Sequence, residues 1–290
     1  MSEQGKKRGD HPDGRLIKDI DAFHIYFANL APRKSTTEVW LKESVDVTDL
    51  LQYIRNKNLN NPTYKTTVFH AMLTVIAKTV HHRPYLNRFI RNGKYYQRNN
   101  ISLSFVAKQK FNDEASEALV CLKVDKDMTM GDISSKVIND VSQARKSGGN
   151  EADDILNTIT KLPGFLLRLI MRVIHLLDRY GKLPKFFYEI DPNFSSVLVS
   201  NLGSIKIDAP YHHLNDFGSN SVMITIGEIH KQSVVNEDNE IVIRDVVNIG
   251  ITLDERIADG YYFAKSVRLF KQMIKNPSCL DLPIETPIEF

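Results

Sequence analysis

Three short segments of this 290-residue chain carry side chains that could move protons or bind a charged group. Residues 254–260 read D-E-R-I-A-D-G, and carboxylates in such a segment can accept a proton or pair with a cation. His212 and His213 lie in the run P-Y-H-H-L, and an imidazole exchanges protons near neutral pH. Ser200 and Asn201 lie in the run V-S-N-L-G and supply a hydroxyl and an amide.

Each of these residues also has a plain structural interpretation. Asp259 precedes a glycine and a helical pattern, which suits a helix N-cap, and Glu255 can simply pair with Arg256. His212 and His213 are adjacent, so their rings do not face one pocket, and no Cys or Asp is placed as a third ligand. We therefore expect no metal site and take loop histidines of this kind as structural or solvent-facing.

Apolar spacing predicts the elements that must position these residues. A turn is predicted after the strand that ends at Ser200, because Asn201 and Gly203 tolerate a positive φ. A second turn is predicted at 236–239, and the interleaved elements favour a mixed sheet with helices on one side. The predicted helices are 46–51, 66–82, 130–147, 162–180 and 260–275, and the predicted strands are 36–45, 101–107, 118–124, 195–200, 221–226 and 241–253.

The composition excludes several classes of protein. The formal charge is +3 and no long block of Lys or Arg occurs, so we expect no nucleic-acid partner. The amino terminus lacks an apolar signal segment, which predicts a cytoplasmic protein, and Cys121 and Cys279 form no redox or metal pair. Residues 1–14 are almost entirely polar and predict a disordered tail, followed by a single domain over 15–290.

Several collinear segments resemble the catalytic domain of the acyltransferase subunits of 2-oxo acid dehydrogenase complexes and the related chloramphenicol acetyltransferases. The block 254–260 resembles the family's H-x-x-x-D-G signature, with Glu255 in the place of the His. The similarity covers most of residues 36–277. The other matching segments are 43–48, 83–87, 100–106, 199–203, 224–227 and 234–235.

The resemblance implies a trimeric α/β domain with the chloramphenicol acetyltransferase-like fold and an active site between neighbouring subunits. Coenzyme A, as acyl carrier, and the acyl acceptor would enter a channel from opposite ends. Ser200 would donate a hydrogen bond to the oxyanion, and Asn201 and Gly203 would belong to the same substrate-binding turn. Asp259 would hold the site in shape as a buried, paired carboxylate.

Glu255 decides whether such a site works. A thiol near pKa 8.5 gives its proton to an imidazole near 6.5 at a cost of about 2.7 kcal/mol, but to a carboxylate near 4.3 at about 5.7 kcal/mol. Burial could raise the pKa of a Glu and recover part of that difference. Three interpretations remain: Glu255 is a working base, the site is inactive, or His212 or His213 has become the base.

Two features depart from the family. The chain carries no lipoyl or subunit-binding domain before the catalytic domain, so no lipoyl group is expected on it. The predicted helix 162–180 is longer and more apolar than expected, with Arg168, Arg172, His175 and Arg179 forming a narrow polar stripe. It could be a core helix, an assembly interface or a basic helix on a membrane surface; we expect no membrane contact.

The sequence thus predicts an acyltransferase-like protein that transfers an acyl group between coenzyme A and a thiol or another acceptor. The alternative is a catalytically inactive homo-oligomeric scaffold that keeps the trimeric fold, in a trimer or a larger symmetric assembly. A third hypothesis is a module that binds a small molecule, without turnover, in the channel that holds the substrates in the family.

Overall fold

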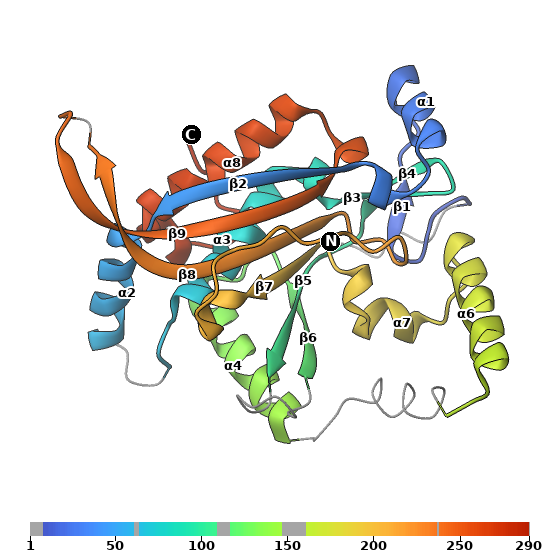
Figure 1. Cartoon of the computed structure of the whole chain (residues 1–290), viewed down its shortest axis with the longest axis horizontal. Helices are drawn as coiled ribbons and strands as arrows, with labels where there is room; N and C mark the ends of the chain where they lie inside the picture. The colour runs from blue at the N-terminus through green and yellow to red at the C-terminus, as the bar shows by residue number, and fades with distance from the viewer. Residues whose placement is uncertain (1–7, 61–63, 109–116, 147–160, 237, 290) are drawn as a thin grey trace.

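A mixed six-stranded sheet forms the centre of the chain (Figure 1). We describe a computed structural model, which covers residues 8–60, 64–108, 117–146, 161–236 and 238–289. The strand order is β2-β9-β8-β7-β5-β6, with β5, β7 and β8 parallel and the other pairs antiparallel. These strands are β2 (Glu38–Asp46), β5 (Ile101–Lys108), β6 (Glu117–Val124), β7 (Val197–Asn201), β8 (Val222–Val235) and β9 (Ile241–Asp254).

Helices cover one face of this sheet, as predicted. Helix α3 is the central one, and its middle turns are buried on every side between the sheet and the other helices. Thr67 begins α3 through a capping box with His70, which satisfies two free backbone N–H groups. The helices on this face are α2 (Thr48–Asn60), α3 (Val68–His82), α4 (Met130–Lys146) and α8 (Gly260–Lys275).

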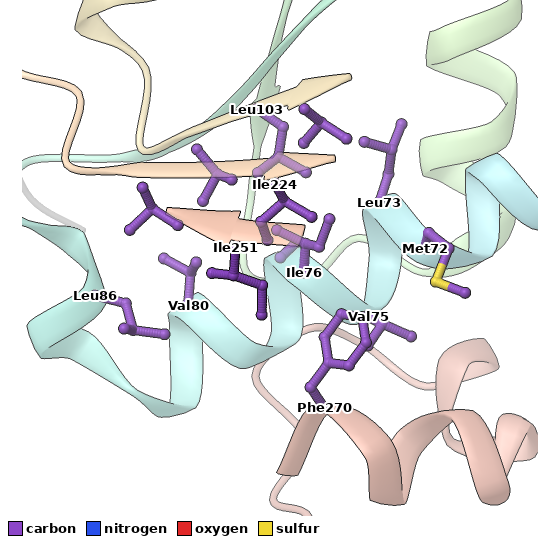
Figure 2. Packing of buried hydrophobic residues seen from close by; sticks show 14 of the residues in the cluster. Met72, Leu73, Val75, Ile76, Val80, Leu86, Leu103, Ile224, Ile251 and Phe270 are labelled. Atoms are coloured by element: carbon purple, nitrogen blue, oxygen red, sulfur yellow. The ribbon is translucent and has the colours of Figure 1, made fainter. Parts of the chain in front are cut away.

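The core between the helices and the sheet contains a small apolar cavity. Figure 2 shows Ile76 and Val80 of α3 near Ile224 and Ile251 of the sheet, with Phe270 of α8 beside them. The cavity has a volume of about 50 Å³ and its two hydroxyls, from Thr79 and Ser266, donate to carbonyl groups of their own helices. This pocket is only partly enclosed, and its apolar lining leaves room for a slightly larger side chain.

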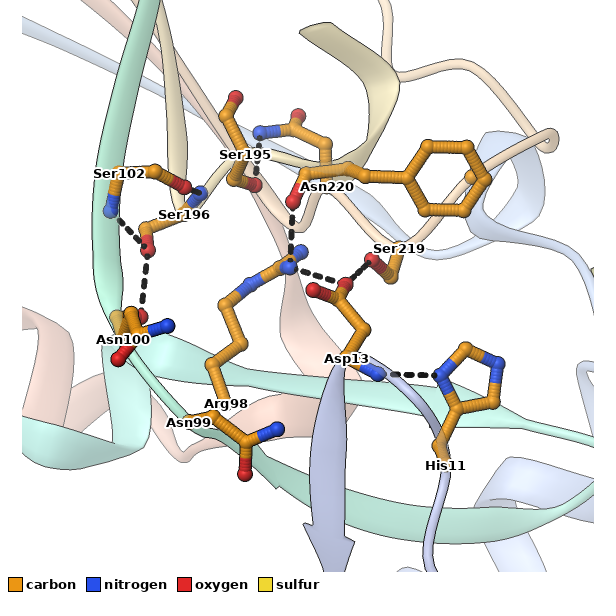
Figure 3. Close-up of polar contacts among 12 residues, drawn as sticks. His11, Asp13, Arg98, Asn99, Asn100, Ser102, Ser195, Ser196, Ser219 and Asn220 are labelled. Atoms are coloured by element: carbon orange, nitrogen blue, oxygen red, sulfur yellow. Dashed lines mark hydrogen bonds and ion pairs between the residues drawn. The ribbon is translucent and has the colours of Figure 1, made fainter. Parts of the chain in front are cut away.

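A second, three-stranded sheet ties the amino-terminal segment to the body. Its order is β1-β4-β3, formed by β1 (Gly14–Leu16), β3 (Arg88–Arg91) and β4 (Lys94–Arg98). Residues 8–14 differ from the expected disordered tail. His11 is buried among aromatic rings, and Asp13 pairs with the buried Arg98 at 2.6 Å and accepts a hydrogen bond from Ser219 (Figure 3). These polar residues are ordered because their partners lie elsewhere in the chain.

Other elements escaped prediction because they are short or lack apolar periodicity. They are β1, β3, β4, α1 (Ala22–Leu30) and α7 (Lys185–Ile190). Strand β8 also runs well beyond the predicted end, to Val235, where it forms a long hairpin with β9 around the predicted turn at 236–239. The predicted residue Ser147 lies outside the described part of the chain.

Helix α6 (Gly164–Arg179) confirms the helix predicted at 162–180 but not its interpretation as a core helix. Asp178 is the one residue of α6 that is fully buried, and half of the apolar side chains are exposed to solvent. In Figure 1, α6 lies at the edge of the molecule, at the same end as α1. The helix therefore presents apolar surface outward.

Candidate functional site

Ser200 lies on the face of the sheet that carries no helices. Val197 and Val199 of β7 point into the core, so the alternation of a strand turns Leu198 and Ser200 to the opposite face. The Ser200 side chain is half-buried there. Thr225 of β8 stands beside it in the sheet register.

A network of serines and an asparagine fixes the start of β7 (Figure 3). The Ser196 hydroxyl accepts a hydrogen bond from the Ser102 backbone at 3.0 Å, and the Ser102 hydroxyl accepts from the Ser196 backbone at 3.2 Å. The Asn220 amide donates to the Ser195 carbonyl at 3.1 Å. These contacts set the position of β7 and therefore of Ser200, four residues further along.

The turn after Ser200 requires glycine. A methyl group on Gly203 would collide with the Gly227 carbonyl oxygen, because the turn packs directly on the backbone of β8. The hydroxyl that satisfies the turn's own backbone belongs to Ser204, which donates to the Asn201 carbonyl at 2.8 Å. Among the described residues the Ser200 hydroxyl has no such partner, so it is available to a bound group.

The block 254–260 is held by an ion pair between Asp254 and Arg256. The guanidinium donates to both carboxylate oxygens, at 2.8 and 2.6 Å, and both side chains are almost completely buried. Arg256 also donates to the Ala31 carbonyl, and Thr37 donates to Asp254 at 3.1 Å. The predicted alternative in which Glu255 pairs with Arg256 is therefore wrong, because Arg256 points to the opposite side of the chain.

Glu255 and Asp259 are both exposed in the single chain. The Glu255 backbone N–H donates to the Thr37 carbonyl at 3.0 Å, which fixes the turn while the carboxylate faces outward. The Asp259 carboxylate accepts a hydrogen bond from the Tyr262 backbone at 2.7 Å and caps α8, as predicted. A buried ion pair of Asp259 with a basic group is not found among the described residues.

The loop that carries His212 and His213 crosses the same helix-free face. Thr225 donates to the Pro210 carbonyl and Thr252 donates to the His212 carbonyl, so the loop runs over β8 and β9. The two imidazoles are exposed and stacked, with ring centroids 4.7 Å apart. Both rings face solvent, which is the expected position for loop histidines of this kind.

The two ends of the predicted site are far apart within one chain. Ser200 pairs with Thr225, Thr225 pairs with Gly250, and Glu255 follows five residues after Gly250. Strands lie about 4.8 Å apart and rise about 3.4 Å per residue, so Ser200 and Glu255 are about 20 Å apart. Their side chains cannot act on one reacting group within a single chain.

Sequence reasoning missed the buried Lys34. Its ammonium donates to the carbonyls of Phe217, Gly218 and Asn220, at 3.3, 3.0 and 2.9 Å, and so holds the end of the histidine loop. Burial lowers the pKa of Lys34 well below its usual value. A lone Lys in a polar run carries no sequence signal for this role, whereas strand alternation could have placed Asp254 and Arg256 on one side.

The described residues offer little for other chemistry. No group of three or more His, Cys, Asp or Glu side chains that could hold a metal ion occurs in them. Cys121 and Cys279 are free and half-buried, and burial raises the pKa of both thiols, which disfavours a thiolate nucleophile. In the same part of the chain, none of the helices has the length and apolar character needed to cross a bilayer.

This architecture is the mixed α/β fold of acyltransferase catalytic cores, the fold called chloramphenicol acetyltransferase-like, as predicted. Residues 191–282 match the family model of the 2-oxoacid dehydrogenases acyltransferase catalytic domain, which confirms the resemblance inferred from the sequence. The matched range contains both the Ser200 turn and the block 254–260. No curated protein matches the chain.

Solved structures with this fold align over nearly the whole chain. A probable dihydrolipoamide acetyltransferase from Listeria monocytogenes has 18% identity and a TM-score of 0.57, covering 91% of this chain and 95% of its own. The dihydrolipoamide acetyltransferase of Azotobacter vinelandii has 12% identity and a TM-score of 0.61, with coverage of 91% and 93%. The cubic core of a pyruvate dehydrogenase complex has 13% identity and a TM-score of 0.61, with 96% coverage of each chain.

Proposed function

We propose that this chain is an acyltransferase that moves an acyl group between coenzyme A and a thiol or another acceptor. The observation that carries the proposal is the family match over residues 191–282, which spans both candidate ends of the site. The Azotobacter vinelandii enzyme was investigated for the role of a serine and of a histidine and an asparagine four positions apart. Glu255 and Asp259 have that same spacing here. A cytoplasmic location is part of the proposal.

Ser200 is the proposed oxyanion donor. Its hydroxyl is half-exposed, is not engaged by the turn, and lies on a strand fixed at its start. A donor placed in advance where negative charge develops lowers a barrier by roughly 3–4 kcal/mol. Asn201 and Gly203 shape the turn beside it.

Glu255 is the proposed base, and a neighbouring copy must bring it to Ser200. The two residues are about 20 Å apart in one chain by strand geometry, and the Glu255 carboxylate is exposed. A homotrimer with the site at the subunit contact would join Glu255 of one copy to Ser200 of the next and would exclude water from both. The cubic core with the same fold supports assembly as a property of this architecture.

The first experiment replaces Ser200 and uses Ser204 as its matched control. Acetyl transfer from acetyl-coenzyme A to a small dithiol is measured for Ser200→Ala and Ser204→Ala. We expect Ser200→Ala to lower kcat by about 100- to 1,000-fold, the usual cost of one oxyanion donor, and Ser204→Ala to leave it nearly unchanged. Equal effects would refute the role of Ser200, and a wild-type chain that neither transfers nor binds coenzyme A would refute the proposal.

The second experiment tests whether the site lies between copies. Ser200→Ala and Glu255→Gln chains, each inactive alone, are expressed together so that mixed trimers form. Half of each kind gives one intact site in about four, so we expect about a quarter of the wild-type activity. If the mixed trimers have no activity, Ser200 and Glu255 do not form one site across the contact between copies. If Glu255→Gln remains active, acetyl transfer is measured for His212→Ala and for His213→Ala. The variant that loses activity identifies the histidine that acts as the base.

The inactive scaffold is the second candidate, because Glu255 stands where the family signature has its His. Glu255→His separates the two. If the native chain has no activity and Glu255→His gains thiol acetylation, the native site has lost its base and the scaffold function is the correct one. If Glu255→His lowers an existing activity, Glu255 is the base.

A further inference from the structure

Helix α6 exposes a continuous apolar stripe. Its members follow one another at intervals of three or four residues and so share one face of the helix. The exposed fractions are 74% for Phe165, 54% for Leu169, 47% for Val173, 55% for Leu176 and 60% for Tyr180. Isolated exposed apolar residues are ordinary, but a stripe along a whole helix marks a contact surface.

Helix α1 adds a second apolar surface at the same end of the molecule (Figure 1). The turn between β3 and β4 connects the two helices: Arg179 of α6 donates to the Asn92 side chain at 3.2 Å, and Gly93 lies against Asn29 of α1. The most exposed apolar residues of α1 are Phe23, Tyr26 and Leu30, with exposed fractions of 69%, 63% and 63%.

The charges beside the apolar stripe have one sign. Exposed arginines lie along α6 beside the apolar stripe, and exposed lysines lie just after the end of the helix. These residues are Arg168, Arg172, Arg179, Lys182 and Lys185. The one acidic residue between positions 164 and 188 is Asp178, which is buried and pairs with Arg91 at 2.9 Å. Helix α6 therefore presents apolar side chains and cations and no exposed carboxylate, whereas α1 begins at the exposed Asp21.

We propose that α6, with α1 beside it, docks the chain on a lipid bilayer that contains anionic lipid. Apolar side chains would enter the boundary between headgroups and acyl chains, while arginines would stay at the level of the phosphates. The aromatic residues at both ends of the stripe suit an interface between water and lipid. A 16-residue helix that lies in the plane of the interface does not need to span the bilayer.

Charge separates this occupant from a second copy that pairs through α6 itself. Two copies that paired through α6 about a two-fold axis would bring the same rows of arginine together, which costs free energy, whereas an anionic surface attracts them. The inference does not depend on acyl transfer, and it replaces the sequence-based expectation that the chain does not contact membranes.

Sedimentation with lipid vesicles tests the inference on the full chain. We expect binding to vesicles of phosphatidylcholine mixed with phosphatidylglycerol, weaker binding to phosphatidylcholine alone, and release at high salt. Leu169→Asp with Leu176→Asp, and separately Arg168→Glu with Arg172→Glu, should each weaken binding by at least about tenfold. The replaced side chains are exposed, so the thermal midpoint should not change.

Two matched double variants serve as controls. Ile241→Asp with Ile243→Asp makes the same change in exposed apolar residues of the β8–β9 hairpin, at the other end of the molecule. Arg55→Glu with Arg268→Glu makes the same charge reversal on α2 and α8, and both controls should bind vesicles as the wild type does.

Three results would overturn the inference. One is a wild-type chain that does not bind anionic vesicles, and another is equal binding by the α6 variants and the wild type. The third is a fall in particle mass without lipid when Leu169 and Leu176 are replaced, which would show that a second copy covers the stripe.

Discussion

Arg256 and Asp254 form the buried ion pair that holds the terminal block, while Glu255 between them faces solvent. The sequence identified residues 254–260 as a candidate site, but it did not show which of these residues have a structural role. Two residues that alternate along a strand end share one side, and the residue between them takes the other. The outward position of Glu255 is thus a consequence of the pair that surrounds it.

Replacing Arg256 with Met should destabilise the fold strongly. Asp254 would remain buried without its cation, and breaking a buried pair in this way costs about 3–5 kcal/mol in the free energy of unfolding. Urea unfolding measures the change. The double variant Asp254→Leu with Arg256→Met should lose less than Arg256→Met alone, and a single variant as stable as wild type would contradict this account.

His11 makes the stability depend on pH. Burial lowers its pKa from 6.5 to about 4 in the folded chain, so the unfolded chain takes up a proton first as the pH falls. The stability that depends on neutral His11 is fully present above about pH 6.5 and is lost as the pH falls from 6.5 to about 4. The total loss in the free energy of unfolding is roughly 3 kcal/mol. Urea unfolding at pH 7.5 and pH 4.5 should show a larger loss for the wild type than for His11→Gln. Equal losses would exclude this role of His11.

At the scale of elements, the long periodic helices and the buried strands were predictable, and the short edge elements were not. Helix α8 and strand β9 match the predicted ranges almost residue by residue, because apolar spacing and clear terminal residues define them. Strands β3 and β4 pair with each other around Asn92-Gly93, whose positive φ angles form a tight turn, and this pair of residues is a local hairpin signal that the sequence-based prediction missed. Strand β1 pairs with β4 across about 80 positions, and pairing over that distance leaves no local pattern.

The cavity between α3, α8 and the sheet gives a prediction at this scale. Val197 lines it and Val199 does not, although both are buried on the same strand. Val197→Ile should fill space and raise the free energy of unfolding by up to about 0.8 kcal/mol. Val199→Ile should overpack its site and lower it by about 1–3 kcal/mol. Denaturant unfolding of the pair checks both signs, and the reverse order would place the cavity elsewhere.

At the scale of the whole molecule, the resemblance to a family predicted the fold, but neither sequence nor a single chain assembles the site. Ser200 lies in one predicted strand and Glu255 lies two residues after the end of another, yet about 20 Å separates them by strand geometry. In the proposed site the missing contact is between copies, and one sequence encodes such a contact only through its surface residues. The same holds for α6. The sequence showed an apolar helix with a narrow polar stripe, but it did not show that apolar residues of the helix are exposed.

We expect the chain to self-associate, because the proposed site needs a neighbouring copy. Three chains of 33.2 kDa give a particle of about 100 kDa, and larger multiples of three would indicate a closed symmetric assembly. Sedimentation velocity at several protein concentrations measures the mass. A monomer at every concentration would remove the partner that the proposed site requires.

Within the part of the chain that the structure describes, strand β2 pairs with β9 alone, and the register joins Glu38 to Asp254, 216 positions later. During synthesis at about 5–20 residues per second, β2 therefore waits about 10–40 s for its partner to leave the ribosome. Throughout that interval the apolar side of β2 and of the helices after it is open to other nascent chains. Production of this protein in a cell should accordingly depend on chaperones that hold the amino-terminal half until the last strand arrives.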